Sequence, residues 1–120
     1  AGAKLVLPGP DLSPEALVRH IQSENVTFYA GVPTKWLSVV QHLQATNQQV
    51  PSLRRLAVGG SAAPRSLMDT LEDDYGVFVS HVWGMTEMTQ GSAGRFTNRV
   101  QDLPRDAQRR RQAMAGRELY

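Results

Sequence analysis

The stretch LAVGGSAAPRSLMDTLEDDYGVFVSHVW, residues 56–83, decides the fold of this 120-residue chain. A short apolar run stops at two glycines, and a helical pattern with Leu67, Met68 and Leu71 on one face follows. A second apolar run, rich in β-branched residues, then ends at Trp83. Strand, helix and strand at this short spacing predict two parallel strands joined by a helix.

The boundaries of this unit follow from local signals. We predict strands over 56–58 and 77–82, and a helix that begins at Pro64, because proline suits an early helical position. Glu72, Asp73 and Asp74 fall in the last turn, where they oppose the helix dipole. Packing must therefore outweigh the dipole in this helix.

The residues before this unit show the same alternation. Ser13 followed by Pro14 predicts a helix start, and Leu17, Val18 and Ile21 give an apolar stripe up to about Glu24. A buried strand is expected over 26–30, then a helix over 34–45 whose inner face holds Trp36, Leu37, Val40 and Leu43. The apolar run at residues 5–7 predicts entry into one more strand. We therefore predict an α/β fold, a parallel β-sheet with alternating helices.

The chain divides by composition into an α/β core part, residues 1–94, and a basic, partly helical segment, residues 95–120. The helix is expected over 104–114, with Gly116 as its cap. Arginine is concentrated in this segment, at Arg95, Arg99, Arg105, Arg109, Arg110, Arg111 and Arg117. Acidic residues interrupt the series and no aromatic stacking pattern accompanies it, so we predict a solvated helix face and no nucleic-acid partner.

Composition excludes several classes of protein. With 41% hydrophobic and 20% charged residues the chain is ordinary globular protein, and its length suits one domain at most. The absence of cysteine excludes disulfides, thiolate zinc sites and a thiol nucleophile. No apolar run reaches the roughly 20 residues that cross a bilayer, and no secretory signal is visible. We expect no transmembrane segment and a cytoplasmic location.

Candidate chemistry lies where the predicted strands end, since ligands of parallel sheets bind beyond the carboxyl ends of the strands. The loop GGSAAP, residues 59–64, allows close backbone approach and presents helix-start amides to an anion. The loop WGMTE, residues 83–87, offers an aromatic face, a hydroxyl and a carboxylate suited to a metal nucleotide. Structural roles stay open for both: a tight turn of small residues, Trp83 in the core, and Glu87 capping a turn.

Three segments in this order resemble the adenylate-forming superfamily of acyl-CoA synthetases, adenylation domains and luciferases. The segment TFYAGVPTKW, residues 27–36, resembles the approach to its acyl pocket, and GGSAAP resembles its nucleotide and acyl contact loop. HVWGMTEM, residues 81–88, resembles its aromatic-Gly-x-Thr-Glu motif, in a version similar to that of fatty-acyl and related carboxylate-CoA ligases. The resemblance covers residues 1–90 well and the remainder loosely.

The resemblance implies roles for particular residues. Trp83 would stack on adenine beside Gly84 and Met85, while Thr86 binds the α-phosphate and Glu87 coordinates magnesium; Thr86 and Glu87 would be the catalytic pair. The other implied contacts are Gly60, Ser61 and Ala62 for the nucleotide, and Tyr29, Gly31, Val32, Pro33, Thr34 and His81 for the acyl substrate. A structural role is an open alternative for His81.

The implied activity is an acid-thiol ligase reaction that uses ATP, Mg²⁺ and coenzyme A to activate a fatty or related carboxylic acid. The family's phosphate loop with its Lys, its Thr-Gly-Asp segment and its C-terminal lid are not found in these residues. We therefore expect an internal fragment of the large N-terminal domain that is inactive alone. The alternatives are a sibling enzyme that loads a carrier protein or acts as a luciferase does, and a non-catalytic remnant that binds a nucleotide or a partner.

Overall fold

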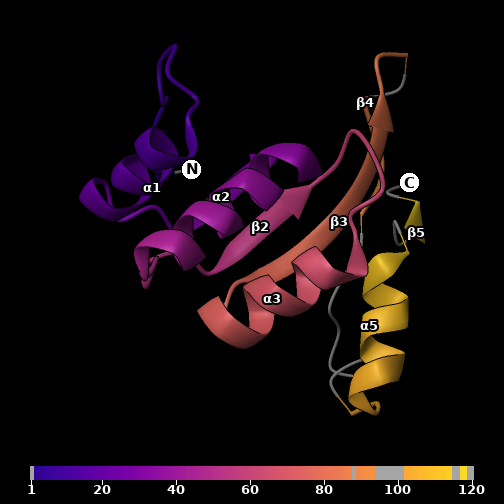
Figure 1. Ribbon diagram of the computed structural model, residues 1–120. Helices are drawn as coiled ribbons and strands as arrows, with labels where there is room; N and C mark the ends of the chain where they lie inside the picture. Colours follow the sequence, from indigo (N-terminus) through magenta and orange to yellow (C-terminus); the bar gives the residue numbers. More distant parts are fainter. Residues whose placement is uncertain (1, 88, 94–101, 115–116, 119–120) are drawn as a thin grey trace.

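The chain is seen in a computed structural model that describes residues 2–87, 89–93, 102–114 and 117–118. The described residues form a five-stranded sheet in the order β1-β2-β3-β4-β5, with helices between the early strands (Figure 1). The strands are β1 (Phe28–Gly31), β2 (Arg55–Val58), β3 (Phe78–Met85), β4 (Thr89–Ala93) and β5 (Arg117–Glu118). The helices are α1 (Pro14–Ser23), α2 (Pro33–Thr46), α3 (Arg65–Tyr75) and α5 (Arg105–Ala113). The predicted α/β class is confirmed.

The sheet is mixed. Strands β1, β2 and β3 are parallel, whereas β4 pairs antiparallel with both β3 and β5. The predicted parallel arrangement is confirmed for the first three strands, and the antiparallel strands β4 and β5 are additions that the sequence did not predict. The connection from Met85 to Thr89 is too short for the crossover that a parallel strand requires, so the chain turns back as a hairpin.

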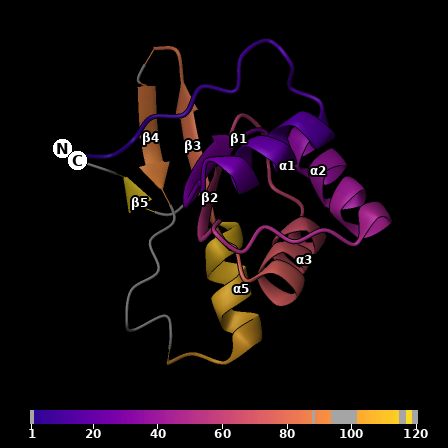
Figure 2. The same cartoon turned by 90° about the vertical axis from the view of Figure 1, so that its left-hand side faces the viewer.

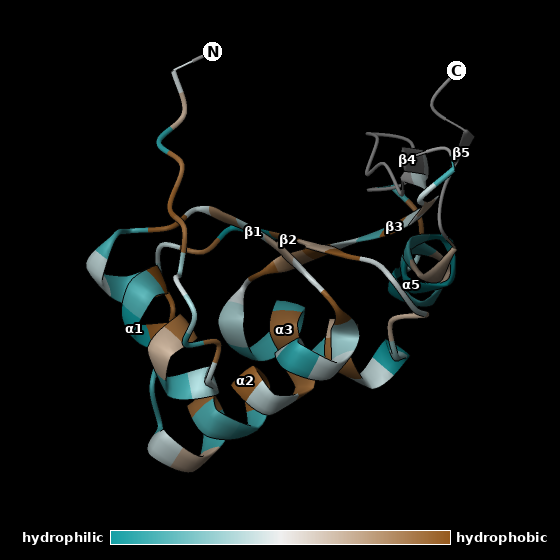
Figure 3. Ribbon diagram, turned by 90° about the horizontal axis from the view of Figure 1, so that it is seen from above, coloured by the Kyte–Doolittle hydropathy of each residue, from teal (hydrophilic) through white to brown (hydrophobic). Residues whose placement is uncertain are grey.

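The described helices cover one face of the sheet (Figure 3). The other face carries Phe28 of β1, which is 57% exposed. The prediction of a buried strand over 26–30 was wrong, because β1 is an edge strand with helices on one side only. Residues 5–7 form no strand, and Leu5 and Leu7 are exposed. An apolar run forms a strand only beside another strand that can pair with it.

Each of the first three helices is followed within two residues by a residue in the left-handed conformation. Asn25 (φ 50°) follows α1, Asn47 (φ 52°) follows α2 and Gly76 (φ 67°) follows α3. After the two asparagines, the amides of Val26 and Gln48 donate back to helix carbonyls five residues earlier, at 3.0 and 3.1 Å. These closures satisfy carbonyls at the helix ends and turn the chain back toward the sheet.

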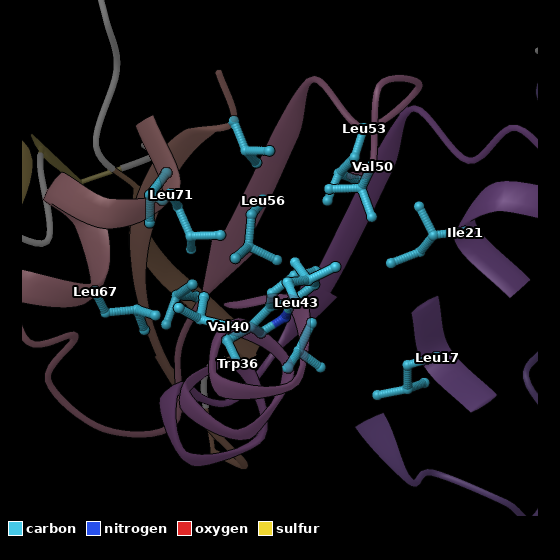
Figure 4. Packing of buried hydrophobic residues seen from close by; sticks show 14 of the residues in the cluster. Leu17, Ile21, Trp36, Val40, Leu43, Val50, Leu53, Leu56, Leu67 and Leu71 are labelled. Atoms are coloured by element: carbon cyan, nitrogen blue, oxygen red, sulfur yellow. The ribbon is translucent and has the colours of Figure 1, made fainter. Parts of the chain in front are cut away.

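The core lies between the sheet and helices α1, α2 and α3 (Figure 4). Most predicted core positions are buried, with Leu43, Leu56, Met68 and Leu71 at 0% exposure. Leu37 is the exception, because it lies on the outer side of α2 with 37% of its surface exposed. The inward position belongs to Val39, which lies with Trp36, Val40 and Leu43 on the buried face.

Helix α5 packs against β3 and is joined to α3 by ion pairs, and Figure 2 shows it beside both elements. The prediction of a solvated basic face is wrong for Arg109, which is only 5% exposed. Its guanidinium forms ion pairs with Asp69, Glu72 and Asp73 of α3. The acids at the end of α3 therefore have partners on a helix more than 30 residues later in the chain. The predicted cap at Gly116 lies outside the described residues.

Candidate functional site

The carboxyl ends of the three parallel strands lie at one edge of the sheet. The register aligns Gly31 of β1 with Val58 of β2, and Val58 with His81 of β3. The segments that follow are the first loop (residues 31–34), the second loop (residues 59–64) and the hairpin tip (residues 83–87). All three candidate segments from the sequence thus begin at the same edge.

The first two loops meet directly. The amide of Gly59 donates to the carbonyl of Gly31 at 3.2 Å. A Cβ added at Gly60 would lie 3.2 Å from Cγ1 of Val32, and the φ of Gly60 is +84°, a conformation that favours glycine. The small residues of the second loop are thus required where the two loops approach each other.

In the first loop, the sequence-predicted residues divide into packed and exposed ones. Tyr29 is half-buried, and its ring meets that of Trp36 edge to face at 5.5 Å. A Cβ at Gly31 would lie 3.1 Å from the indole nitrogen of Trp36. Burial raises the pKa of Tyr29, so its hydroxyl stays protonated at neutral pH. Trp36 was assigned to the core by sequence, and it also shapes this wall of the site.

The rest of the first loop turns toward solvent. Val32 is 44% exposed and Thr34 is exposed, whereas Pro33 is buried at the first position of α2. The proline fixes the helix start and lacks an amide hydrogen that would need a partner there. Val32 and Thr34 are therefore the members of this loop that a substrate can reach.

The second loop approaches β3 as well as β1. A Cβ at Gly59 would lie 2.7 Å from Cγ2 of Val82 and 3.0 Å from its carbonyl oxygen. Ser61 and Ala62 are exposed, and α3 begins at Arg65, one residue later than predicted. The loop is consequently held against the strand that leads to Trp83.

The hairpin tip is built differently from the prediction. Strand β3 does not stop at 82 but continues through Met85, with a bulge between Trp83 and Gly84, and pairs there with β4. Thr86 and Glu87 lie in the turn, and both are exposed. Trp83 is 48% exposed, so much of its ring is available to a ligand. The WGMTE segment therefore projects past the end of β2, as Figure 1 shows.

His81 lies at the base of this projection and contacts the backbone of α5. Its Nδ1 is 2.9 Å from the carbonyl oxygen of Ala113. A carbonyl can only accept, so Nδ1 carries a proton, and in the neutral imidazole Nε2 is left as an acceptor. The imidazole thus bonds to the backbone of α5, which supports a structural role for His81. Its Nε2 can still contact a substrate.

A magnesium ion was implied at Glu87. Within the part of the chain that the structure describes, no three His, Asp or Glu side chains are grouped to hold a metal ion. Magnesium is commonly held by one or two carboxylates together with substrate phosphates and water. An exposed Glu87 next to the hydroxyl of Thr86 fits that donor set, with the nucleotide supplying the remaining oxygens.

Sequence reasoning placed Gly59 in the candidate loop but did not predict that it lies against β3, and it missed the partners of α5. Two signals were available for the second: Arg105 and Arg109 are four residues apart on one helix, and Asp69 and Asp73 have the same spacing on another. Such complementary spacing predicts two helices whose charges can pair. It does not say which helices meet.

Comparisons with known proteins show the family of this chain. The family model described as AMP-binding enzyme matches residues 1–119. A long-chain-fatty-acid–CoA ligase of Thermus thermophilus is 54% identical over 86 residues, 72% of this chain and 16% of the relative. A 3-methylmercaptopropionyl-CoA ligase of Ruegeria lacuscaerulensis is 40% identical over 121 residues, 100% of this chain and 22% of the relative. The chain thus spans about a fifth of the length of these relatives.

A solved structure has the same fold. The anthranilate CoA ligase AuaEII, crystallised with anthranoyl-AMP, superposes with a TM-score of 0.72 at 18% identity. The match covers 94% of this chain and 20% of that chain.

Proposed function

Because this chain belongs to the AMP-binding enzyme family, we propose that it forms part of the large N-terminal domain of an acyl-CoA ligase. The reaction activates a fatty or related carboxylic acid with ATP and transfers the acyl group to coenzyme A. The relatives named as CoA ligases support this choice. The observation that carries it is that the three loops begin at one edge of the sheet: Gly59 bonds to Gly31, and a Cβ at Gly59 would crowd Val82, the residue before the hairpin tip.

The hairpin tip supplies the nucleotide contacts in this proposal. The exposed ring of Trp83 stacks on adenine, with Gly84 and Met85 beside it, and the hydroxyl of Thr86 binds the α-phosphate. Glu87 holds magnesium, which when bound offsets the negative charge of the phosphates. Gly60, Ser61 and Ala62 lie against the nucleotide from the second loop.

The first loop borders the acyl substrate. Val32 and Thr34 contact it directly, while Tyr29 and Gly31, which lie near Trp36, and the buried Pro33 shape the wall behind them. His81 offers Nε2 as an acceptor at the base of the hairpin.

In the first half-reaction a carboxylate oxygen attacks the α-phosphorus of ATP, and pyrophosphate leaves. The hydroxyl of Thr86 donates to a phosphoryl oxygen as charge builds on it. In the second half-reaction the coenzyme A thiol attacks the acyl carbonyl and AMP leaves. No described residue is assigned as a base for that step. The 120 residues alone are not expected to complete either half, since positioning ATP requires further groups.

The proposal also covers the partners of the enzyme and its location. Its partners are small molecules, the carboxylic acid, ATP and coenzyme A, and we expect no nucleic acid. The arginines of α5 support this, because Arg105, Arg109 and Arg110 are paired with carboxylates. No helix in the described part of the chain has the length and apolar character to cross a bilayer. We propose a cytoplasmic location.

The test uses the product of the gene that encodes these residues. Purified protein should release pyrophosphate and form a CoA thioester when given a fatty acid, ATP and Mg²⁺. Glu87→Gln should lower kcat about 10²- to 10³-fold, as loss of one transition-state contact does. Trp83→Ala should raise KM for ATP about 5- to 150-fold, the range for loss of one stacking contact.

Glu15→Gln is the matched control, because Glu15 is an exposed carboxylate on α1, away from the proposed site. It should leave both constants unchanged. Absence of acid-dependent pyrophosphate release from the unaltered gene product would overturn the proposal, as would Glu87→Gln with full activity.

A further inference from the structure

The outer edge of β3 is closed in two different ways along its length. From Val82 onward it pairs with β4. Below that point, at Val79, the amide donates to Oε1 of Glu72 at 3.2 Å, and the carbonyl accepts from Nε2 of Gln112 at 2.6 Å. Two side chains, one from α3 and one from α5, thus occupy the place where a neighbouring strand would donate and accept.

These two side chains are also bonded to each other and to a buried arginine. Gln112 donates to Oε1 of Glu72, and its own Oε1 accepts from Nη1 of Arg109 at 2.9 Å. The same Nη1 donates to Oε2 of Glu72, and Nε of Arg109 lies 2.8 Å from Oδ1 of Asp69. Arg109 is 5% exposed and Gln112 is 6% exposed. We call Glu72, Arg109 and Gln112 the edge clamp.

The chemistry of the edge clamp is interdependent. Glu72 uses both carboxylate oxygens, one for the strand and Gln112, the other for Arg109. Removing the arginine leaves a partly buried carboxylate without its cation, and removing Gln112 leaves the Val79 carbonyl without this donor. A buried polar group that loses its partner is expensive, so the strand edge depends on all three side chains.

The clamp leads directly to the hairpin tip. One residue after Gln112, the carbonyl of Ala113 accepts from Nδ1 of His81, two residues after Val79. The next residue, Val82, begins the pairing with β4, and Trp83 follows it. The clamp therefore holds β3 at the point from which the hairpin projects.

We infer that Glu72, Arg109 and Gln112 are positioning residues for the hairpin tip. They set the path of β3 below Val82 and so the place of Trp83, Thr86 and Glu87, without touching the substrate. That the tip then binds a nucleotide rests on the proposed function. The mechanical part of the inference, that the clamp orders the hairpin, stands independently of it.

The test combines amide hydrogen exchange with kinetics of the gene product. Gln112→Ala and Arg109→Met are compared with the control Arg110→Met. Arg110 has an exposed guanidinium that pairs with Asp106 on the same helix. Both clamp variants should speed exchange of the amides at 82–85 about tenfold, while Arg110→Met does not. Exchange in β1 and β2 should stay unchanged, which separates positioning from general destabilisation.

In the ligase assay, the clamp variants should raise KM for ATP about tenfold and change kcat less, because nucleotide binding loses an ordered tip. If Arg109→Met does not fold, the inference is tested with Gln112→Ala alone, because this variant leaves no buried charge without its partner. Faster exchange spread evenly over the sheet, or unchanged exchange at 82–85, would overturn the inference. Selective exchange at 82–85 in a gene product without ligase activity would support the inference and contradict the proposed function instead.

Discussion

Gly59→Ala tests how the second loop is held against β3. The added methyl carbon would lie 2.7 Å from Cγ2 of Val82 and 3.0 Å from the carbonyl oxygen of the same residue. The first contact can be relieved by rotating a side chain, whereas the second involves the backbone of a paired strand. The loop must therefore move away from β3, or the strand must shift.

The expected loss follows from this crowding. Inserting a methyl group into a filled space destabilises by about 1–3 kcal/mol. For a domain of this size about 1 kcal/mol lowers Tm by about 4 °C, so Tm should fall by about 4–12 °C. Thermal unfolding followed by circular dichroism measures the shift.

Two further variants isolate the cause. Val82→Ala removes Cγ2 but not the carbonyl, so the double variant should be less destabilised than the sum of the single ones, by about 1 kcal/mol. Gly76→Ala is the control, because Gly76 has φ +67° with no atom within 4 Å of the added carbon. It should lose about 1 kcal/mol through backbone strain alone and show no coupling to Val82→Ala. Additive losses for Gly59 and Val82 would refute the reasoning.

Four other substitutions test the helices. Leu43→Ala, at a side chain with 0% exposure, should cost about 2–5 kcal/mol in chemical denaturation, whereas Leu37→Ala should cost much less. Ser13→Ala removes the oxygen that accepts from the Ala16 amide at 3.3 Å and should cost about 1 kcal/mol; an unchanged midpoint would contradict the cap. The hydrogen bond from Arg65, with that from Arg110, lowers the pKa of Asp106. The ionised Asp106 therefore contributes to the stability of the folded state above the pKa of the unfolded carboxyl, about 3.9. This contribution is lost as the pH falls through the folded pKa. Asp106→Asn should therefore lower Tm slightly at pH 7 and not at low pH, and an equal loss at both would exclude the ion pairs as its cause.

Local signals explain what the sequence predicts well. The first three helices begin and end within two residues of the predicted positions, since Ser13, Pro33, Pro64 and Gly76 act on the backbone beside them. Leu37 was misplaced because the apolar side chains of α2 extend around more than one face.

The strand β4 was missed because its sequence, TQGSA, shows neither apolar alternation nor β-branched enrichment. Its pairing is decided by the preceding strand, which a local pattern does not contain. Helix α5 was predicted, but its packing was not, because the carboxylate partners of the buried Arg109 lie 36 to 40 residues away along the chain. The charge pattern of α5 alone predicts that its arginines face solvent, because the carboxylates that pair with them lie on α3.

At the site, the sequence predicts the residue types and their order but not the hairpin. Resemblance points to Trp83, Thr86 and Glu87, and the structure adds that they lie on a projecting turn beside loops that touch each other. His81 could not be interpreted from sequence, because its partner is a backbone carbonyl of α5. Long-range hydrogen bonds of this kind leave no mark on local composition.

The central claim is that the three loops form one site for an acyl-adenylate. The most direct measurement is amide exchange of the gene product with and without a non-hydrolysable acyl-adenylate analogue. The account predicts slower exchange within residues 31–34, 59–64 and 83–87 together, and loss of this effect in Trp83→Ala. Tight binding of the analogue with no protection in these three segments would contradict the account.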